Sequence, residues 1–296
     1  MSFGIVLLVV LILIFHPRAD LAPANTLPME TTTTEGLLFK SGYSDVSGIR
    51  MYYETYGQGK PLILIHGGGS TIQTTFGRII PQLAKHRQVI ALELQAHGRT
   101  SDRNNDISFE QDADDIVGLL NNLAINKADF FGFSNGGTTA LQIAIRYPGF
   151  VDKLIVASAL YKRRGAAPAF WEFMKQAKLE HMPQPYKDAY KAVALEPENL
   201  HIMHDKCAKR MVTFQDIEDE QIKSIKAKTL IIIADKDVMT PEHAVEMYRL
   251  IDNSQLCIIP GGHGEYIGEI TTLRATCKDR DFVVPLIEKF LDSIEA

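Results

Sequence analysis

The 296-residue chain has little cysteine, a single tryptophan and no block of basic residues. None of its three cysteines follows a C-x-x-C spacing, which argues against a zinc–thiolate site. In an oxidising compartment Cys257 and Cys277 are candidates for a disulfide, and packing as small buried side chains is the alternative. The 31 basic residues are scattered among 36 acidic ones, and the net charge is −5. Because nucleic-acid-binding proteins concentrate positive charge on one surface, nucleic acid is not an expected partner.

The chain also lacks a membrane span of ordinary length at its N-terminus. The apolar run at residues 3–15 is shorter than the roughly 20 residues that cross a bilayer. Ala22-Pro23-Ala24 then gives a small-x-small pattern like that of a signal-peptidase site. We expect residues 1–24 to be a signal peptide that exports the protein to the periplasm or the medium, leaving no stable membrane span in the mature form. An uncleaved N-terminal anchor is the alternative, and residues 25–35 are expected to be a disordered spacer.

Short apolar runs alternate with helical stretches along the remainder of the chain, which is typical of a parallel sheet wrapped by helices. These runs are continuously apolar, because both faces of a parallel strand are covered. The predicted buried strands are residues 61–65, 88–94, 128–133, 154–159, 229–234 and 255–259. A hairpin is expected over 46–57, with Ser47-Gly48 at its turn. The predicted fold class is α/β, with a mostly parallel central sheet and flanking helices.

Residues 160–226 interrupt this alternation with helical, amphipathic sequence that contains no buried strand. Ligands of open α/β sheets bind beyond the carboxyl ends of the strands, so we expect this segment to form a helical cap over the site. The core then consists of residues 36–159 and 227–296. Several large apolar side chains of the cap could line a pocket, but at helical spacing such residues more often pack inside. They are Phe170, Trp171, Phe173, Met174, Met203 and Met211.

The segment GFSNG at residues 132–136 has the pattern G-x-S-x-G. It ends the predicted strand 128–133 and opens a predicted helix over 137–147, which is the strand–turn–helix context of a nucleophile elbow. Glycine is needed two positions before and after the serine, since so tight a turn leaves no room for a Cβ atom. We predict Ser134 as the nucleophile, because its hydroxyl would stand at a helix N-terminus that favours negative charge. Simple N-capping by this serine is the alternative.

Three consecutive glycines follow the predicted strand 61–65, in the segment HGGGS at residues 66–70. Without side chains, their backbone N–H groups can approach a ligand closely. We predict that the Gly68 N–H, with Gly69 as the second choice, forms an oxyanion hole together with the Asn135 N–H. A phosphate-binding loop is a weaker interpretation, because the Lys-Ser/Thr of a P-loop is missing.

A serine nucleophile needs a histidine base and a carboxylate that orients it, in the chain order Ser, acid, His on this scaffold. The predicted strand 229–234 is followed by Asp235 and Asp237. We choose Asp237 as the acid, because it lies farther past the strand end, and we expect Asp235 to cap backbone amides. His263, in a glycine-rich loop after the last predicted strand, is the predicted base.

The other histidines have competing interpretations. His66 and His97 precede the serine and are expected to shape loops. His201 and His204 are three residues apart on a predicted helix and could share a metal ion. A solvated helix face is the preferred interpretation, because no third ligand is evident.

Together these segments resemble the α/β-hydrolase superfamily, of the serine-nucleophile, helical-cap type, from about residue 42 to residue 294. The matching segments are residues 66–69, 95–101, 132–136, 234–237 and 262–263. By matching position, the resemblance implies Ser134 as nucleophile, Asp237 as acid and His263 as base. It implies Gly68 and Asn135 as oxyanion donors. Members usually have glycine at position 234, where this chain has alanine.

The expected activity is that of a serine hydrolase, carboxylesterase- or lactonase-like (EC 3.1.1), which cleaves a small-molecule carboxylic ester or related carbonyl compound. The expected mechanism is acyl transfer through a Ser-His-Asp triad and an acyl-enzyme, with no cofactor and no metal. A ligand-binding or sensor protein of the same fold is the main alternative, because fold does not settle function. An acyltransferase, a C–C hydrolase and a perhydrolase also remain open.

Overall fold

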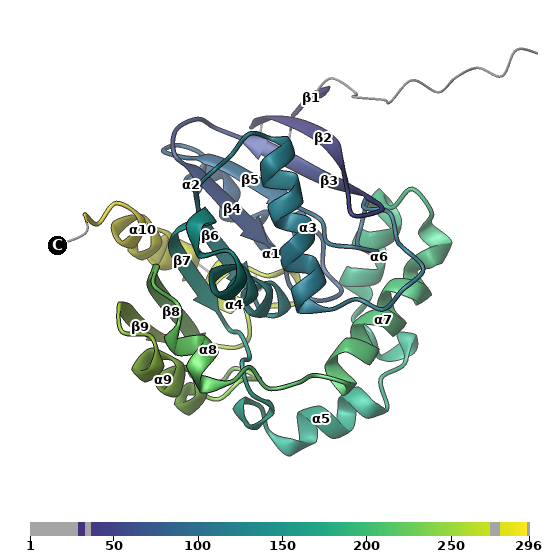
Figure 1. Ribbon diagram of the computed structural model, residues 1–296. Coiled ribbons are helices and arrows are strands. Elements are labelled where there is room, and N and C mark those ends of the chain that lie inside the picture. Colours follow the sequence, from purple (N-terminus) through teal and green to yellow (C-terminus); the bar gives the residue numbers. More distant parts are fainter. Residues whose placement is uncertain (1–28, 33–36, 273–278, 295–296) are drawn as a thin grey trace, which may run out of the picture.

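The computed structural model describes residues 29–32, 37–272 and 279–294. This part of the chain contains a nine-stranded sheet in the order β1-β2-β3-β5-β4-β6-β7-β8-β9 (Figure 1). Its strands are β1 (Met29–Thr32), β2 (Leu38–Val46), β3 (Ile49–Tyr56), β4 (Pro61–Ile65), β5 (Gln88–Leu92), β6 (Ala128–Phe133), β7 (Val151–Ala157), β8 (Lys228–Ala234) and β9 (Ser254–Ile259). The first three strands are antiparallel, and β4 to β9 run parallel. The predicted mostly parallel α/β architecture is therefore confirmed.

The predicted strands agree with the observed ones apart from their ends. β5 stops two residues before its predicted end, and β7 begins three residues earlier than predicted. The predicted hairpin is also present, since β2 and β3 pair across Ser47 and Gly48. Both of these residues have positive φ, 44° and 85°, as the two central residues of a tight type I′ hairpin turn require.

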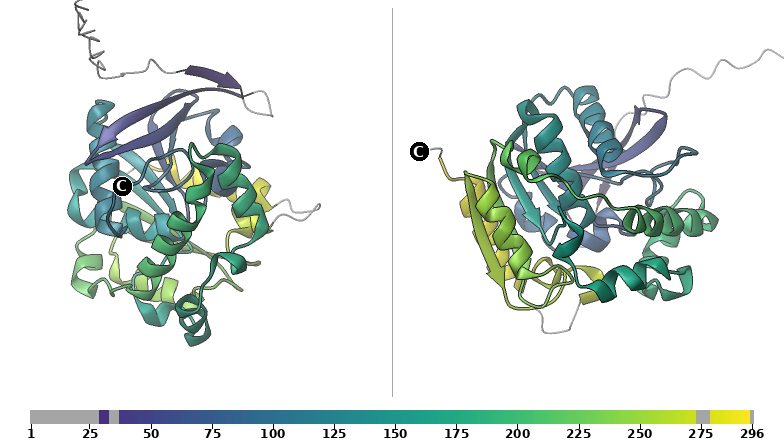
Figure 2. Two further views of the ribbon diagram at one scale, coloured as in Figure 1. Left: turned by 90° about the vertical axis from the view of Figure 1, so that its right-hand side faces the viewer. Right: turned by 60° about the horizontal axis from the view of Figure 1, so that its bottom comes forward.

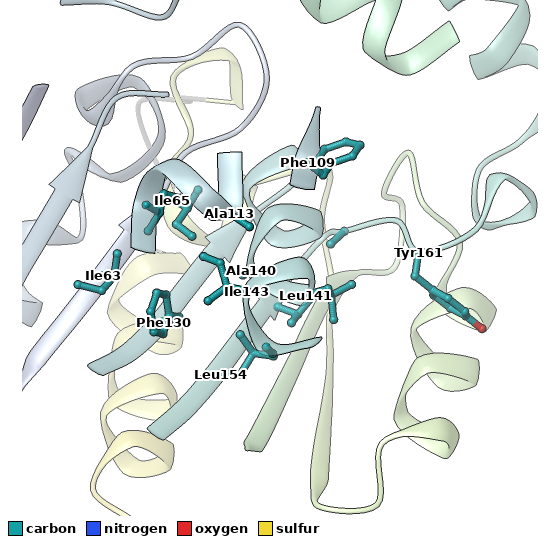
Figure 3. Close-up of a cluster of buried hydrophobic side chains, with 14 of the residues drawn as sticks. Ile63, Ile65, Phe109, Ala113, Phe130, Ala140, Leu141, Ile143, Leu154 and Tyr161 are labelled. Carbon is teal, nitrogen blue, oxygen red and sulfur yellow. The ribbon is translucent and has the colours of Figure 1, made fainter. Parts of the chain in front are cut away.

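Helices cover both faces of the sheet, as expected for strands that are apolar throughout. The helices are α1 (Ile72–Phe76), α2 (Ile80–Leu83), α3 (Phe109–Asn122), α4 (Asn135–Arg146), α5 (Pro168–Lys175), α6 (Gln184–Val193), α7 (Leu200–Val212), α8 (Asp219–Lys223), α9 (Pro241–Leu250) and α10 (Asp279–Leu291). Along β4, Ile63 and Ile65 pack with α3 and α4, whereas Leu62 and Leu64 pack with α1, α2 and α10. Figure 3 shows part of the first cluster, where side chains of β4 and β6 meet those of α4.

The spacer predicted over residues 25–35 is wrong for its central part. Met29–Thr32 forms strand β1, antiparallel to β2. β2 would otherwise present an unpaired edge, and the two threonines favour extended backbone, so the edge accepts one more short strand.

The predicted signal peptide, residues 1–24, lies outside the described residues, and export stays a prediction. Among residues 29–32, 37–272 and 279–294, no helix combines the length and the apolar character needed to cross a bilayer.

The helical insertion, residues 160–226, stands between β7 and β8 and contains α5, α6, α7 and α8. In Figure 2, right, α5 to α7 extend beyond one end of the sheet. A buried ion pair joins this insertion to the core, since Arg210 of α7 donates to Asp112 of α3 at 2.6 Å. The guanidinium also lies over the ring of Phe109, 4.6 Å from its centroid. This contact holds α7 in place above the strand ends.

We predict that Arg210→Ala lowers the free energy of unfolding by about 3 kcal/mol, because it leaves the buried Asp112 carboxylate without its partner. Replacing both residues with apolar ones, Arg210→Met with Asp112→Leu, should restore most of the loss. Lys175→Ala, which removes an exposed pair with Glu172, should change stability by less than about 0.5 kcal/mol. Urea unfolding of the four proteins measures this. An Arg210→Ala protein as stable as Lys175→Ala would contradict the prediction.

Candidate active site

The candidate site begins with the turn between β6 and α4. Ser134 has φ 55° and ψ −122°, a strained conformation for a residue with a side chain. A Cβ atom at Gly132 would lie 2.2 Å from the Gly136 carbonyl oxygen, and one at Gly136 would lie 2.1 Å from the Ile65 carbonyl oxygen. These distances give the reason for both glycines of the motif. The strand–turn–helix context predicted around Ser134 is present, with the helix starting at Asn135.

Three side chains from different strand ends meet at this turn. The Ser134 Oγ lies 3.1 Å from His263 Nε2, and Asp237 Oδ1 lies 2.6 Å from His263 Nδ1. Ser134 follows β6, Asp237 follows β8 and His263 follows β9. With Nδ1–H donated to the carboxylate, Nε2 carries the lone pair that accepts the serine proton. The structure thus brings together all three side chains that the sequence analysis selected.

The Asp237–His263 contact changes the pKa of both groups. Burial lowers the pKa of His263, but the charge and hydrogen bond of Asp237 outweigh it, and the net direction is upward. Burial raises the pKa of Asp237, but the charge and hydrogen bond of His263 outweigh it, and the net direction is downward. Each shift favours the charged form, so the pair can stabilise an imidazolium while Asp237 stays ionised.

Sequence reasoning missed the groups that hold Asp237. The Ser158 hydroxyl, at the end of β7, donates to Asp237 Oδ2 at 2.5 Å and lies 2.7 Å from the Tyr266 hydroxyl. The Met239 N–H donates to Oδ1. These partners come together only through the strand order of the sheet, and no local pattern marks Ser158 or Tyr266. Asp235 instead accepts a hydrogen bond from the Gly261 N–H, which confirms its predicted role as a cap for backbone amides.

The glycine loop, residues 66–70, lies against the nucleophile turn. A Cβ atom at Gly68 would lie 2.4 Å from Asn135 Nδ2, and one at Gly67 would lie 3.4 Å from the Ser134 Cβ. The Gly69 N–H is already donated, to His97 Nε2 at 3.1 Å. The Gly68 N–H has no acceptor within the described part of the chain, which favours Gly68 over Gly69 as a donor. The Asn135 N–H starts α4 and has no intrahelical acceptor.

Ser134 and His263 open into a pocket of ≈ 360 Å³ between the core and the helical insertion. The apolar part of its wall comes mainly from α5 and α7, namely Phe170, Phe173, Met174, Met203, Ala208 and Met211. Five of the six apolar candidates from the sequence therefore line the pocket. Trp171 instead packs against Phe214 in the core. Lys178 is the one lysine or arginine among the described lining residues, and its side chain is 69% exposed.

The four other histidines considered in the sequence analysis have two kinds of environment. His66 and His97 are fully buried and bonded to loop backbone, so their predicted loop-shaping role is confirmed. His201 is exposed, whereas His204 lines the pocket, so the expected solvated helix face holds for His201 alone. No group of three or more candidate metal ligands occurs within the described residues. Cys257 forms no disulfide with another described residue, and because Cys277 lies outside the described ranges, the pairing of these two cysteines stays a prediction.

Comparisons with known proteins agree with this geometry. A family model described as alpha/beta hydrolase fold matches residues 60–199. The 2-hydroxymuconate semialdehyde hydrolase of Pseudomonas sp. (strain CF600) is 40% identical over 114 residues, 37% of this chain and 40% of that protein. The aligned stretch thus spans less than half of that relative's own length.

Two longer matches cover most of the chain. The 2-hydroxy-6-oxo-2,4-heptadienoate hydrolase of Pseudomonas putida is 26% identical over 233 residues, 71% of this chain and 84% of that protein. The crystal structure of the enol-lactonase from Burkholderia xenovorans LB400 is similar with a TM-score of 0.67 at 20% identity, covering 85% of this chain and 100% of that one. The matched family model, the strand order and the nucleophile turn agree: the chain has the α/β-hydrolase fold.

Proposed function

We propose that this protein is a serine hydrolase that cleaves esters or lactones with an apolar, uncharged acyl group through a covalent acyl-enzyme. The observation that carries the proposal is the hydrogen-bonded chain from Ser134 Oγ through His263 to Asp237. It stands at the wall of a pocket that is large enough for a small-molecule substrate.

In the proposed reaction His263 Nε2 takes the proton of Ser134 while Oγ attacks the substrate carbonyl carbon. The carbonyl oxygen becomes an oxyanion that accepts hydrogen bonds from the Gly68 and Asn135 N–H groups. The imidazolium then gives its proton to the leaving alkoxide, and the acyl-enzyme forms. A water molecule, deprotonated by the same histidine, then attacks the acyl carbon, and the imidazolium returns its proton to Ser134 Oγ as the acid is released. Asp237 stays ionised and holds the imidazole in one tautomer.

The pocket wall supports an apolar acyl group. Methionine and phenylalanine side chains of α5 and α7 contribute five of its residues, and thioethers adapt to chains of different shape. A substrate carboxylate would find Lys178 as the one side chain of fixed positive charge in the described lining, and that side chain lies largely in solvent. An acidic substrate would therefore be desolvated there without a close partner.

The names of two relatives favour a second candidate, hydrolysis of a carbon–carbon bond next to a carbonyl group. Those relatives are named for 2-hydroxymuconate semialdehyde and for 2-hydroxy-6-oxo-2,4-heptadienoate. The same serine, histidine and oxyanion donors could serve that reaction. Turnover of such substrates with no turnover of any ester or lactone would replace the first proposal with this one.

We predict that the protein, without residues 1–24, is labelled by a fluorophosphonate and hydrolyses p-nitrophenyl butyrate and aliphatic lactones. Ser134→Ala should abolish labelling and lower kcat by at least about 1,000-fold, because Ser134 is the nucleophile that contacts His263 among the described residues. Ser224→Ala, an exposed serine, is the matched control and should behave as the wild type.

Three outcomes would contradict the proposed function or its mechanism. Labelling of Ser134 without turnover of any ester, lactone or diketone would favour a ligand-binding protein. Transfer of the acyl group to added alcohol in preference to water would identify an acyltransferase. Unchanged ester hydrolysis in Ser134→Ala would remove the proposed mechanism.

A second prediction concerns pH. Because Asp237 holds the pKa of His263 above the ordinary value of about 6.5, the imidazole stays protonated, and unable to accept the serine proton, farther up the pH scale. The acidic limb of kcat/KM should therefore have its midpoint above that value. Asp237→Asn should move the midpoint downward and reduce kcat by about 10⁴-fold. An acidic limb at the same pH in both proteins would rule out control of His263 by Asp237.

A further inference from the structure

Two buried histidines join the glycine loop to the loop that follows β5, and each accepts a hydrogen bond from the backbone of the opposite loop. His66, the first residue of the glycine loop, accepts a hydrogen bond at Nε2 from the Leu94 N–H at 3.1 Å. His97, in the second loop, accepts one at Nε2 from the Gly69 N–H, also at 3.1 Å. The two rings lie 5.0 Å apart, centroid to centroid. The arrangement is a reciprocal clasp between the two loops.

The other ring nitrogens fix the tautomers. His66 Nδ1 lies 2.7 Å from the Gly67 carbonyl oxygen, and His97 Nδ1 lies 2.8 Å from the Gln95 carbonyl oxygen. Carbonyl oxygens only accept, so each Nδ1 carries the proton and each Nε2 is left as an acceptor. Burial is the largest cause of a lowered pKa in both rings, and the positive charge of Arg210 adds to it. The pKa of His97 falls to about 4, and the pKa of His66 falls well below its usual range. Both rings are therefore neutral at physiological pH.

We propose that His97 is a positioning residue for the reaction, which holds the glycine loop so that the Gly68 N–H points at the developing oxyanion. This inference rests on the proposed function. Gly68 stands between two residues whose conformation the clasp fixes, His66 and Gly69. His97 also occupies the Gly69 N–H, whereas the Gly68 N–H has no acceptor within the described residues. The residue acts through the backbone and does not contact the substrate.

A donor aimed at the oxyanion lowers the barrier only if it is already in place when the charge develops. A run of three glycines does not hold its own conformation, because glycine loses more backbone freedom on folding than any other residue. An external acceptor therefore has to fix the loop. His97 supplies it from a segment packed against β3, where the Tyr52 N–H donates to Thr100.

The test compares three variants. His97→Leu removes the acceptor with little change in volume, and we expect kcat to fall about 10- to 100-fold while KM changes less than about threefold. His97→Gln keeps an acceptor oxygen and should recover most of the kcat. His243→Leu is the matched control, because His243 is also buried and accepts a backbone N–H, that of Tyr161 at 3.1 Å, away from the glycine loop. It should lose comparable thermal stability but keep kcat within about threefold.

The outcomes separate this inference from the proposed function. If the wild type turns over esters and His97→Leu matches His243→Leu in kcat, the positioning role is wrong. A fall in kcat of the same size in His97→Gln would also overturn it. If the wild type shows neither labelling nor turnover, the proposed function fails, and amide hydrogen exchange still tests the clasp. Exchange over residues 66–70 should rise at least about 10-fold in His97→Leu and stay unchanged in His243→Leu; equal exchange in both would refute the clasp.

Discussion

The close approach of two backbone segments at the nucleophile turn is the constraint on which the rest of the site depends. The turn around Ser134 lies so near the end of β4 that a single methyl group at Gly136 would overlap the Ile65 carbonyl oxygen. This contact places Asn135, the first residue of α4, against the glycine loop, where a Cβ atom at Gly68 would lie 2.4 Å from its side chain. The strained φ of Ser134 is tolerated because the surrounding sheet and helix leave that residue no other conformation.

The parallel sheet brings the other side chains of the site together. Strands β4, β6, β7, β8 and β9 all end at one edge, and each is followed by residues of the site or of its support. Ser134 and His263 are 129 positions apart in the chain, yet their side chains are in hydrogen-bond contact. Strand order, rather than any local sequence, supplies this proximity, which is the general property of ligand sites in open α/β sheets.

The same distinction explains how far the sequence could predict the molecule. The sequence predicts the triad because Ser134, Asp237 and His263 each follow an apolar run that is recognisable as a buried strand. Chain order then limits the choice of acid and base. Ser158 and Tyr266 could not be found, since the hydrogen bonds of Ser158 to Asp237 and to Tyr266 depend on β7 lying between β6 and β8. The edge strand β1 was missed for a similar reason: four residues with no alternating pattern pair only because β2 offers them an edge.

Two parts of the chain, the core and the helical insertion, contribute different groups to the pocket. The core contributes backbone donors and a hydrogen-bonded chain whose atoms are fixed by the sheet, whereas α5 and α7 contribute methionine and phenylalanine side chains that can change rotamer at little cost. Changes in the helical insertion can therefore alter the shape and charge of the wall without moving the reacting atoms. This separation is consistent with relatives of the same fold that are named for different substrates. In the proposed function the substrate carbonyl meets fixed donors while its substituents meet an adaptable surface, so the fold constrains the chemistry more tightly than the substrate.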